Sequence, residues 1–326
     1  MSKTKTNKRH NSRKNKNKRI TRKNKNKRIT RKNKTQYGGA NPQETKFISL
    51  CGKKYINLKT VQDFYQKYKR DIDISASKEQ AFRTACAKKH LDVAQWLLDI
   101  KPTINISVYN EEAFLYACEH NHLDVAQWLV NMGQTLGRPI NVSINNEAAL
   151  RTACYNGDLN IAKWLYSINP SMDISAWGER PFRVACDQNN LDVAKWLYSI
   201  KPSINISIDE EAAFRSACHN GHLKMAKWLL KIKPDIDISI RDNEPFNGTC
   251  YNEHLDVAQW LQTLKPYLYT IKTKRDGSFK CNVNTELEAR INNRTTALHA
   301  ASDYASPNVL NRIPEDVSRY IIQEYL

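Results

Sequence analysis

Cysteine and tryptophan recur at a fixed interval through the centre of this 326-residue chain. Each of six cysteines is followed ten residues later by a tryptophan, and successive copies are 32 residues apart, with one interval of 36. The cysteines are Cys86, Cys118, Cys154, Cys186, Cys218 and Cys250, and the tryptophans are Trp96, Trp128, Trp164, Trp196, Trp228 and Trp260. A constant period between about 20 and 50 residues predicts a stacked array of repeats.

Each period contains the pattern of two helices and an arm. Phe82 and Cys86 lie four residues apart, which places them on one face of a short first helix. Residues 91–100 are apolar except for one narrow polar stripe, which predicts a second helix covered on most sides. Pro102 ends that helix because it has no N–H to donate. Residues 104–107 then alternate Ile-Asn-Ile-Ser and predict a short extended arm.

The repeat resembles the ankyrin repeat. Pro181-Phe182 and Pro245-Phe246 match its proline-leucine step, Gly221-His222-Leu223 matches its inter-helix turn, and Thr296-Ala297-Leu298-His299 comes closest to its opening tetrapeptide. Two departures recur: a tryptophan occupies a usually aliphatic site, and arginine replaces the motif histidine at Arg83, Arg151, Arg183 and Arg215. The resemblance covers residues 41–326 and implies an all-α helix-turn-helix solenoid with short hairpin arms, acting as a protein-binding scaffold. The sequence is also similar to ankyrin arrays of large DNA viruses, which implies a viral protein that contacts host components.

Departures from the period suggest five segments. Residues 1–40 are predicted to be a disordered tail, 41–75 a degenerate capping repeat, and 76–271 six full repeats. Asp276-Gly277 stands between two alternating segments and predicts an inserted hairpin over residues 272–294. Residues 295–326 resume as a degenerate last repeat followed by a helix.

Nearly all the excess positive charge lies in the tail. Residues 1–34 hold 17 Lys or Arg and no acidic residue, whereas the rest of the chain holds 34 basic and 33 acidic residues. Three interpretations stay open: a nuclear or nucleolar address, a clamp on the phosphates of a nucleic acid, as in a virion-associated protein, or a tail that only keeps the chain solvated. No aromatic residue is available there for base stacking, so binding would ignore base sequence. The candidate tail residues are Arg13, Lys14, Lys16, Lys18, Arg19, Arg22, Lys23, Lys25, Lys27, Arg28, Arg31 and Lys32.

The eight cysteines are predicted to be free and mostly buried. Equivalent positions in neighbouring repeats are about 8–10 Å apart, which is too far for a disulfide. Free thiols at this density fit a reducing, intracellular compartment such as the cytoplasm or nucleus. No apolar run approaches the length of a membrane span, and no secretion signal is evident, so we expect no membrane contact.

No pattern typical of an active site is present in the sequence. It contains no glycine-rich phosphate loop, no paired-cysteine metal motif and no recognisable nucleophile–base pair, so neither an enzyme nor a cofactor is expected. His90, His122, His222 and His254 are expected to satisfy backbone groups at the inter-helix turns. Each arginine of the series follows a glutamate by four residues, and these pairs are predicted to neutralise each other within one helix. The pairs are Glu79–Arg83, Glu147–Arg151, Glu179–Arg183 and Glu211–Arg215.

Partner binding is expected at positions that vary between repeats. Trp177 is the only tryptophan outside the helical register, and exposed aromatic residues dominate binding hot spots. We expect the chain to be a monomer and Trp177 to lie at the centre of a concave patch that binds a protein partner. The alternative is that Trp177 folds over the neighbouring arm tip. The candidate partner-binding residues are Tyr109, Asn110, Tyr116, Asn145, Tyr155, Trp177, Asp209 and Arg241.

The C-terminal 14 residues resemble the first helix of an F-box. Such an element follows the ankyrin array in poxvirus proteins that recruit cullin-type ubiquitin ligases, and the resemblance implies a substrate adaptor. The alternative is an amphipathic helix that caps the last repeat. The matching residues are Ile313, Pro314, Asp316, Val317, Ile321 and Ile322.

Overall fold

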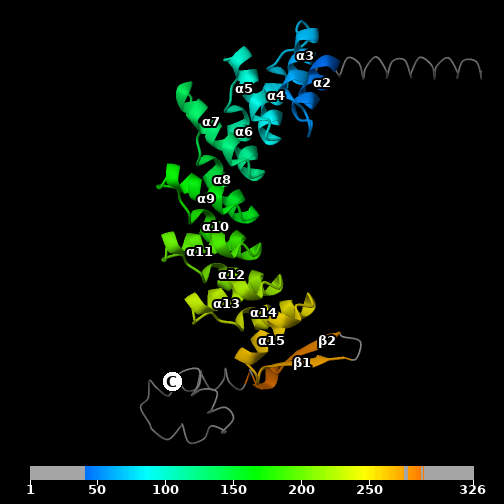
Figure 1. The fold of residues 1–326 in the computed structure, drawn as a ribbon. Helices are drawn as coiled ribbons and strands as arrows, with labels where there is room; N and C mark the ends of the chain where they lie inside the picture. The colour runs from blue at the N-terminus through cyan, green and yellow to red at the C-terminus, as the bar shows by residue number, and fades with distance from the viewer. Residues whose placement is uncertain (1–40, 275–277, 288, 290–326) are drawn as a thin grey trace, which may run out of the picture. The chain divides into compact units, whose positions relative to one another are not determined.

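The computed structural model describes residues 41–274, 278–287 and 289 (Figure 1). The basic tail of residues 1–34 and the C-terminal residues 295–326 lie outside the described residues, so the predictions made for them stay predictions. The described chain divides into two units, Met1–Ala149 and Leu150–Leu326, and the boundary falls inside one helix. Each unit is described by itself.

Unit 1 consists of helix pairs. Its helices are α2 (Pro42–Cys51), α3 (Leu58–Tyr68), α4 (Ala76–Ala87), α5 (Leu91–Ile100), α6 (Val108–Glu119), α7 (Leu123–Thr135) and the first part of α8 (Ile144–Asn156). The first helices of successive pairs, α2, α4 and α6, pack side by side. Helix α2 begins with a capping box, in which Asn41 and Glu44 bind each other's backbone N–H groups.

Unit 2 continues the same pattern and ends in a hairpin. It holds the rest of α8, then α9 (Leu159–Ile168), α10 (Ala176–Asp187), α11 (Leu191–Ile200), α12 (Ile208–His219), α13 (Leu223–Ile232), α14 (Ile240–Tyr251), α15 (Leu255–Leu264), β1 (Tyr269–Thr273) and β2 (Phe279–Val283). Helices α10, α12 and α14 form one layer of neighbours (Figure 1). The mostly helical repeat fold predicted from the period is therefore confirmed.

Aromatic contacts join several repeats to the repeats that follow them. The phenylalanine of one first helix contacts the tryptophan of the following second helix, with ring centroids 6.1 Å apart for both Phe82–Trp128 and Phe182–Trp228. The phenylalanines are fully buried and the tryptophans half-buried. No single repeat covers its own phenylalanine, so stacking is what completes the core.

The arms are turns and not the short strands that alternation predicted. In the first full repeat, Ile104 and Ile106 are buried, and the Asn105 side chain accepts the N–H of Ser107 at 3.1 Å. Ser75, Ser143, Ser175 and Ser239 make the same bond to the Asp or Asn two residues earlier. The polar residue between the isoleucines therefore closes an Asx turn, which competes with strand formation.

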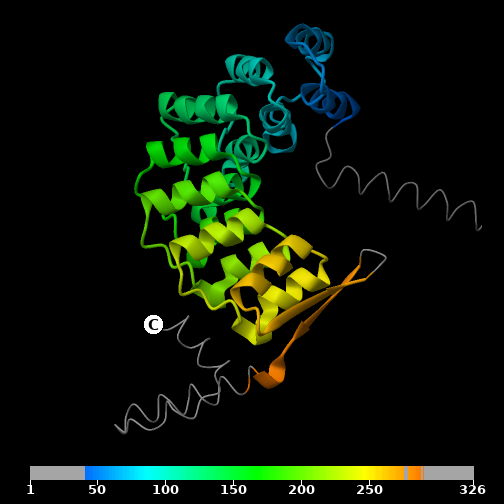
Figure 2. The same cartoon turned by 60° about the horizontal axis from the view of Figure 1, so that its bottom comes forward.

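An antiparallel hairpin follows α15 (Figure 2), and its first strand begins at Tyr269, three residues before the predicted segment 272–294. Tyr269 is opposite Val283 and Thr273 is opposite Phe279. Tyr269 is fully buried and stacks on Phe246 at 4.1 Å, so it occupies the place that a tryptophan takes after each earlier phenylalanine. The hairpin thus covers the last helix pair of unit 2.

The cysteine prediction is right for six residues and wrong for two. Cys51, Cys86, Cys118, Cys154, Cys186 and Cys218 are free and buried. Cys250, however, forms a disulfide with Cys281 of β2, with Cα atoms 6.1 Å apart. The distance argument applied only to equivalent positions in neighbouring repeats, and Cys281 lies outside the repeat.

None of the helices in the described part of the chain is long and apolar enough to cross a membrane.

Candidate protein-binding surface

Six short left-handed turns present the variable residues of the array. At the start of each first helix, three consecutive residues have positive φ, for example Ser77, Lys78 and Glu79 at 53°, 57° and 59°. The first two residues of each turn are called the arm tip: Ser77-Lys78, Tyr109-Asn110, Asn145-Asn146, Trp177-Gly178, Asp209-Glu210 and Arg241-Asp242. Left-handed conformation costs most residues about 1–2 kcal/mol each, so other contacts must hold the turns.

A buried glutamate supplies one of those contacts. The third residue of each turn is glutamate in the first five repeats, and its side chain is at least nine-tenths buried. Glu179 Oε1 accepts the N–H of Asn205 in the next arm at 3.4 Å, and Glu111 accepts that of Asn141 at 3.3 Å. In the last repeat Asn243 takes this position and accepts the hydroxyl of Tyr269 at 2.8 Å. The carboxylates of Glu79, Glu111 and Glu179 therefore tie their arms to the arms that follow.

Three of the four arginines, Arg83, Arg183 and Arg215, do not form the predicted pairs within one helix. The glutamates at i−4 are buried against the next arm, and the arginines reach the next repeat instead. Arg83 pairs with Glu112, Arg183 with Asp209, and Arg215 with both carboxylate oxygens of Glu244 at 2.7–2.8 Å. Arg215 also donates to the carbonyl oxygens of Asp209 and Glu210 in its own arm tip, at 3.1 and 2.7 Å. Arg83 and Arg215 therefore connect their own arm tip to the next repeat.

Trp177 is the most exposed tryptophan of the described chain. Its side chain is 60% exposed, and the guanidinium of Arg151 lies 5.0 Å from its ring centroid. Trp177 has φ 57° and ψ 44°, so a non-glycine aromatic residue is held in a left-handed conformation. The neighbouring Gly178 has φ 65°, and a Cβ there would lie 3.1 Å from Ile208. The ring is thus oriented by its neighbours while much of its surface remains open.

Tyr109 occupies the equivalent position in unit 1. It is 52% exposed, with Lys78 Nζ and Arg83 Cζ each 4.7 Å from its ring centroid. Cation–π contacts of this kind contribute about 0.5–1 kcal/mol at exposed sites. In both units, therefore, the arginine of one repeat lies over the aromatic arm tip of the next repeat.

The remaining candidates separate between the units. Unit 1 holds Asn110 and Asn145, both exposed at arm tips, and half-buried Tyr116 on α6, whose pKa a hydrogen bond to Glu112 raises. Unit 2 holds exposed Tyr155 at the end of α8, and two charged tips, of which Asp209 pairs with Arg183 and Arg241 with Glu210. Membership of all these residues in one concave patch stays a prediction.

The prediction that the turn histidines satisfy backbone groups is met by His222, whereas the buried Nε2 of His90 has no hydrogen-bond partner among the described residues. His222 Nε2 is 2.9 Å from the Asp187 carbonyl oxygen of the preceding repeat, and Asn190 Nδ2 donates to the Cys154 and Tyr155 carbonyl oxygens at 2.9 and 2.7 Å. Burial lowers the pKa of His122, partly opposed by a hydrogen bond to the Cys86 carbonyl. Within the described ranges, no three His, Cys, Asp or Glu side chains gather in a way that could hold a metal ion.

Two features of the structure were not predicted from the sequence. The ion pairs between the arginines and the next repeat were missed because a glutamate at i−4 offered a nearer partner. The disulfide of Cys281 was also missed, although Cys281 is the one cysteine after the hairpin turn that falls outside the regular spacing. The tail residues and the F-box-like residues lie in the undescribed segments, so neither hypothesis is tested.

Comparison with known proteins identifies the repeat. A family model of ankyrin repeats in many copies matches residues 114–165 and 182–230, and a model of three ankyrin repeats matches residues 50–139. Among solved structures, an ankyrin repeat family protein from Legionella pneumophila is 20% identical, with a TM-score of 0.36, over 68% of this chain and 69% of that chain. No curated protein matches the sequence. Together the family matches span about half of the chain, which belongs to the ankyrin-repeat family.

Proposed function

We propose that this ankyrin-repeat protein is a non-enzymatic scaffold that binds a partner protein through the arm tips of unit 2, around Trp177. The observation that carries the proposal is the placement of Trp177, which is 60% exposed although its conformation is held in place. An aromatic side chain that is already ordered loses little conformational entropy when a partner covers it. Trp177 therefore has the properties of a binding hot spot.

The charges around Trp177 give the surface its specificity. Arg151 lies over the ring, Arg180 is exposed on the following turn of α10, and Arg183 pairs with Asp209 of the next arm tip. Burial, and to a smaller extent the charge of Arg180, lowers the pKa of Arg183. A partner that places an apolar group on Trp177 and an acidic group near Arg180 would match this arrangement.

The test compares two exposed aromatic residues. Full-length Trp177→Ala and Tyr55→Ala chains, each fused to a proximity-labelling enzyme, are expressed in cells and their labelled proteins quantified. Tyr55 is 86% exposed and belongs to unit 1, far from Trp177 in sequence. Trp177→Ala is expected to lose at least one protein that both the wild type and Tyr55→Ala label. Identical sets from all three chains would overturn the proposal.

A second function is favoured by the charge segregation in the sequence. The 17 basic residues and no acidic residue of positions 1–34 make this tail a candidate for sequence-independent nucleic-acid binding. The test measures retention of the full chain and of residues 41–326 on immobilised duplex DNA at increasing salt. The full chain is expected to elute at clearly higher salt, and equal elution would remove the tail as a phosphate clamp.

A further inference from the structure

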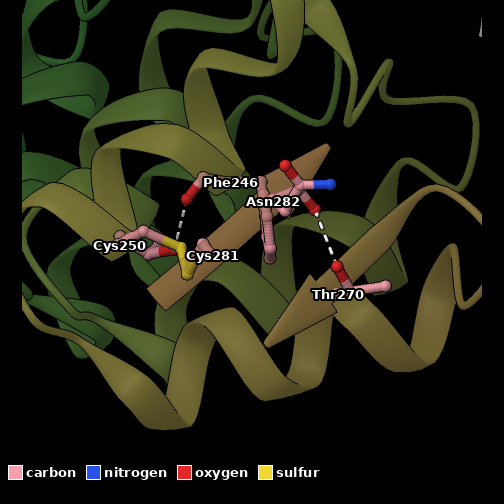
Figure 3. The surroundings of a disulfide bond; sticks show 6 residues. Phe246, Cys250, Thr270, Cys281 and Asn282 are labelled. Atoms are coloured by element: carbon pink, nitrogen blue, oxygen red, sulfur yellow. Dashed lines mark hydrogen bonds between the residues drawn. A yellow bond between two sulfur atoms is a disulfide. The ribbon is translucent and has the colours of Figure 1, made fainter. Parts of the chain in front are cut away.

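The disulfide Cys250–Cys281 joins the last repeat to the hairpin that covers it (Figure 3). Cys250 lies near the end of α14 and Cys281 in the middle of β2, 31 residues later. Both residues are half-buried. The disulfide is therefore within reach of solvent at the end of unit 2.

The other cysteines have the opposite environment. Cys86, Cys118, Cys154, Cys186 and Cys218 occupy the same repeat position as Cys250, and each is fully buried. Burial raises the pKa of the thiols of Cys86, Cys154, Cys186 and Cys218, and it raises that of Cys51 to about 12. Thiol exchange requires a thiolate and access to the sulfur. Within the part of the chain that the structure describes, Cys250 and Cys281 are the only cysteines that are partly exposed.

The difference arises from the element that covers each first helix. In earlier repeats the next first helix packs against the one that carries the cysteine, as α12 does against α10. After α14 the chain instead continues through α15 into β1 and β2, and β2 contacts α14. A two-stranded sheet covers less of α14 than a further helix pair would. The repeat cysteine at this end is therefore the one that stays accessible.

The two strands of the hairpin are held in different ways. The chain at β1 is anchored without the disulfide, because Tyr269 stacks on Phe246, donates its hydroxyl to Asn243, and donates its N–H to the Lys265 carbonyl at 3.0 Å. The side chains of β2 are at best half-buried. Its covalent link to α14 is Cys281. Breaking the disulfide would leave β1 in place and remove the covalent attachment of β2 to α14, so that β2 would be held by its pairing with β1 and by noncovalent contacts with α14.

We propose that Cys250–Cys281 is a reversible redox site that latches β2 onto α14. A dithiol reductant opens it by thiolate attack on one sulfur, which breaks the S–S bond, forms a mixed disulfide and releases the other cysteine as a thiolate. The second thiol of the reductant then displaces the mixed disulfide. The products are two protein thiols and the oxidised reductant. Reduction thereby exposes the end of α14 that β2 covers.

The test measures hydrogen exchange of the full chain before and after dithiothreitol, with reduction verified by alkylation and intact mass. Peptides that cover 279–283 and the C-terminal half of α14 are expected to exchange at least about tenfold faster after reduction. Peptides of α10 and α12, whose cysteines are free, serve as the internal control and should not change. Removal of the reductant under air should restore the slow exchange.

Two variants distinguish loss of the Cys250–Cys281 disulfide from a general effect of the reductant. Cys281→Ser and the double variant Cys250→Ala, Cys281→Ala should exchange rapidly in β2 without dithiothreitol and show no further change when it is added. Unchanged exchange in the fully reduced wild type would overturn the proposal. So would alkylation of both cysteines in protein prepared without reductant, because the bond would then not form.

Discussion

The hydroxyl of Tyr269 donates a buried hydrogen bond of 2.8 Å to Asn243 Oδ1. Asn243 stands where the earlier repeats carry a glutamate that accepts from the next arm, so this pair replaces the inter-arm contact at the end of the array. The phenol also stacks on Phe246, as each earlier phenylalanine contacts a tryptophan. One residue of the hairpin thus completes both the polar and the aromatic contacts of the last repeat.

Tyr269→Phe is expected to destabilise the end of unit 2 by about 1–2 kcal/mol. The stacking on Phe246 is kept, but Asn243 is left with a buried acceptor that has lost its donor. Hydrogen exchange of β1 and α14 measures the effect locally. Tyr267→Phe is the matched control, because Tyr267 is 51% exposed and should change exchange little.

Glu179→Ala should destabilise the junction between two arms by about 1–2 kcal/mol, since it removes the acceptor of the Asn205 N–H in a partly buried contact. Urea denaturation measures the loss. Arg180→Ala, on the neighbouring exposed residue, should change the free energy of unfolding by less than about 0.5 kcal/mol. Equal effects of the two substitutions would show that the carboxylate does not join the arms.

Arg215→Lys is expected to cost about 1–2 kcal/mol despite the retained charge. Arg215 binds both oxygens of Glu244 and two carbonyl oxygens of its own arm tip, and the single ammonium of lysine cannot reproduce this fork. Arg180→Lys is the control on an exposed arginine. If Arg215→Lys were as stable as the wild type, the Arg215–Glu244 pair would contribute no more than an ordinary surface salt bridge.

Protonation of His122 should lower the free energy of unfolding as the pH decreases. Burial lowers the folded-state pKa of this base below its usual value of about 6.5, so the unfolded chain binds protons that the folded chain does not. The contribution of His122 is therefore fully present above about pH 6.5 and declines as the pH falls from there toward the lowered folded pKa.

His122→Asn should flatten this part of the curve. Asn190 fills the same turn position in a later repeat and donates to the preceding repeat's carbonyl oxygens, so the substituted side chain can keep the contact without titrating. Urea denaturation at pH 5.5 and 7.5 provides the comparison. An unchanged pH dependence in His122→Asn would exclude His122 as its source.

The regular part of the fold was predictable because the period repeats the same packing problem. Phe82, Cys86 and Trp96 mark the covered sides of both helices, and equivalent residues recur in the other copies, with Leu150 in place of the phenylalanine in one of them. The left-handed arm tips were not predictable from propensity, since residues such as Trp177 rarely adopt positive φ and do so here because Glu179 and its neighbours hold the turn. Tertiary contacts, and not local preference, fix that backbone.

The candidate surface was predictable only in outline. The variable arm tips are exposed apart from half-buried Gly178, and their role in binding stays a prediction. The partners of Arg83 and Arg215 lie about 29 residues away and cannot be read from i, i+4 spacing. The disulfide shows the same limit, because it joins a repeat position to a residue outside the repeat. Pairings across the period depend on how the repeats stack.

The most direct test of the account measures stability and partner capture together in Trp177→Ala and Trp196→Ala. Trp196 is half-buried and contacts Tyr166 at 6.0 Å, so its removal should destabilise the array by about 3 kcal/mol. Trp177→Ala is predicted to keep the wild-type urea denaturation curve while losing the partner protein that proximity labelling identifies. A Trp177→Ala chain that loses stability as Trp196→Ala does, or that retains the partner in full, would contradict the account.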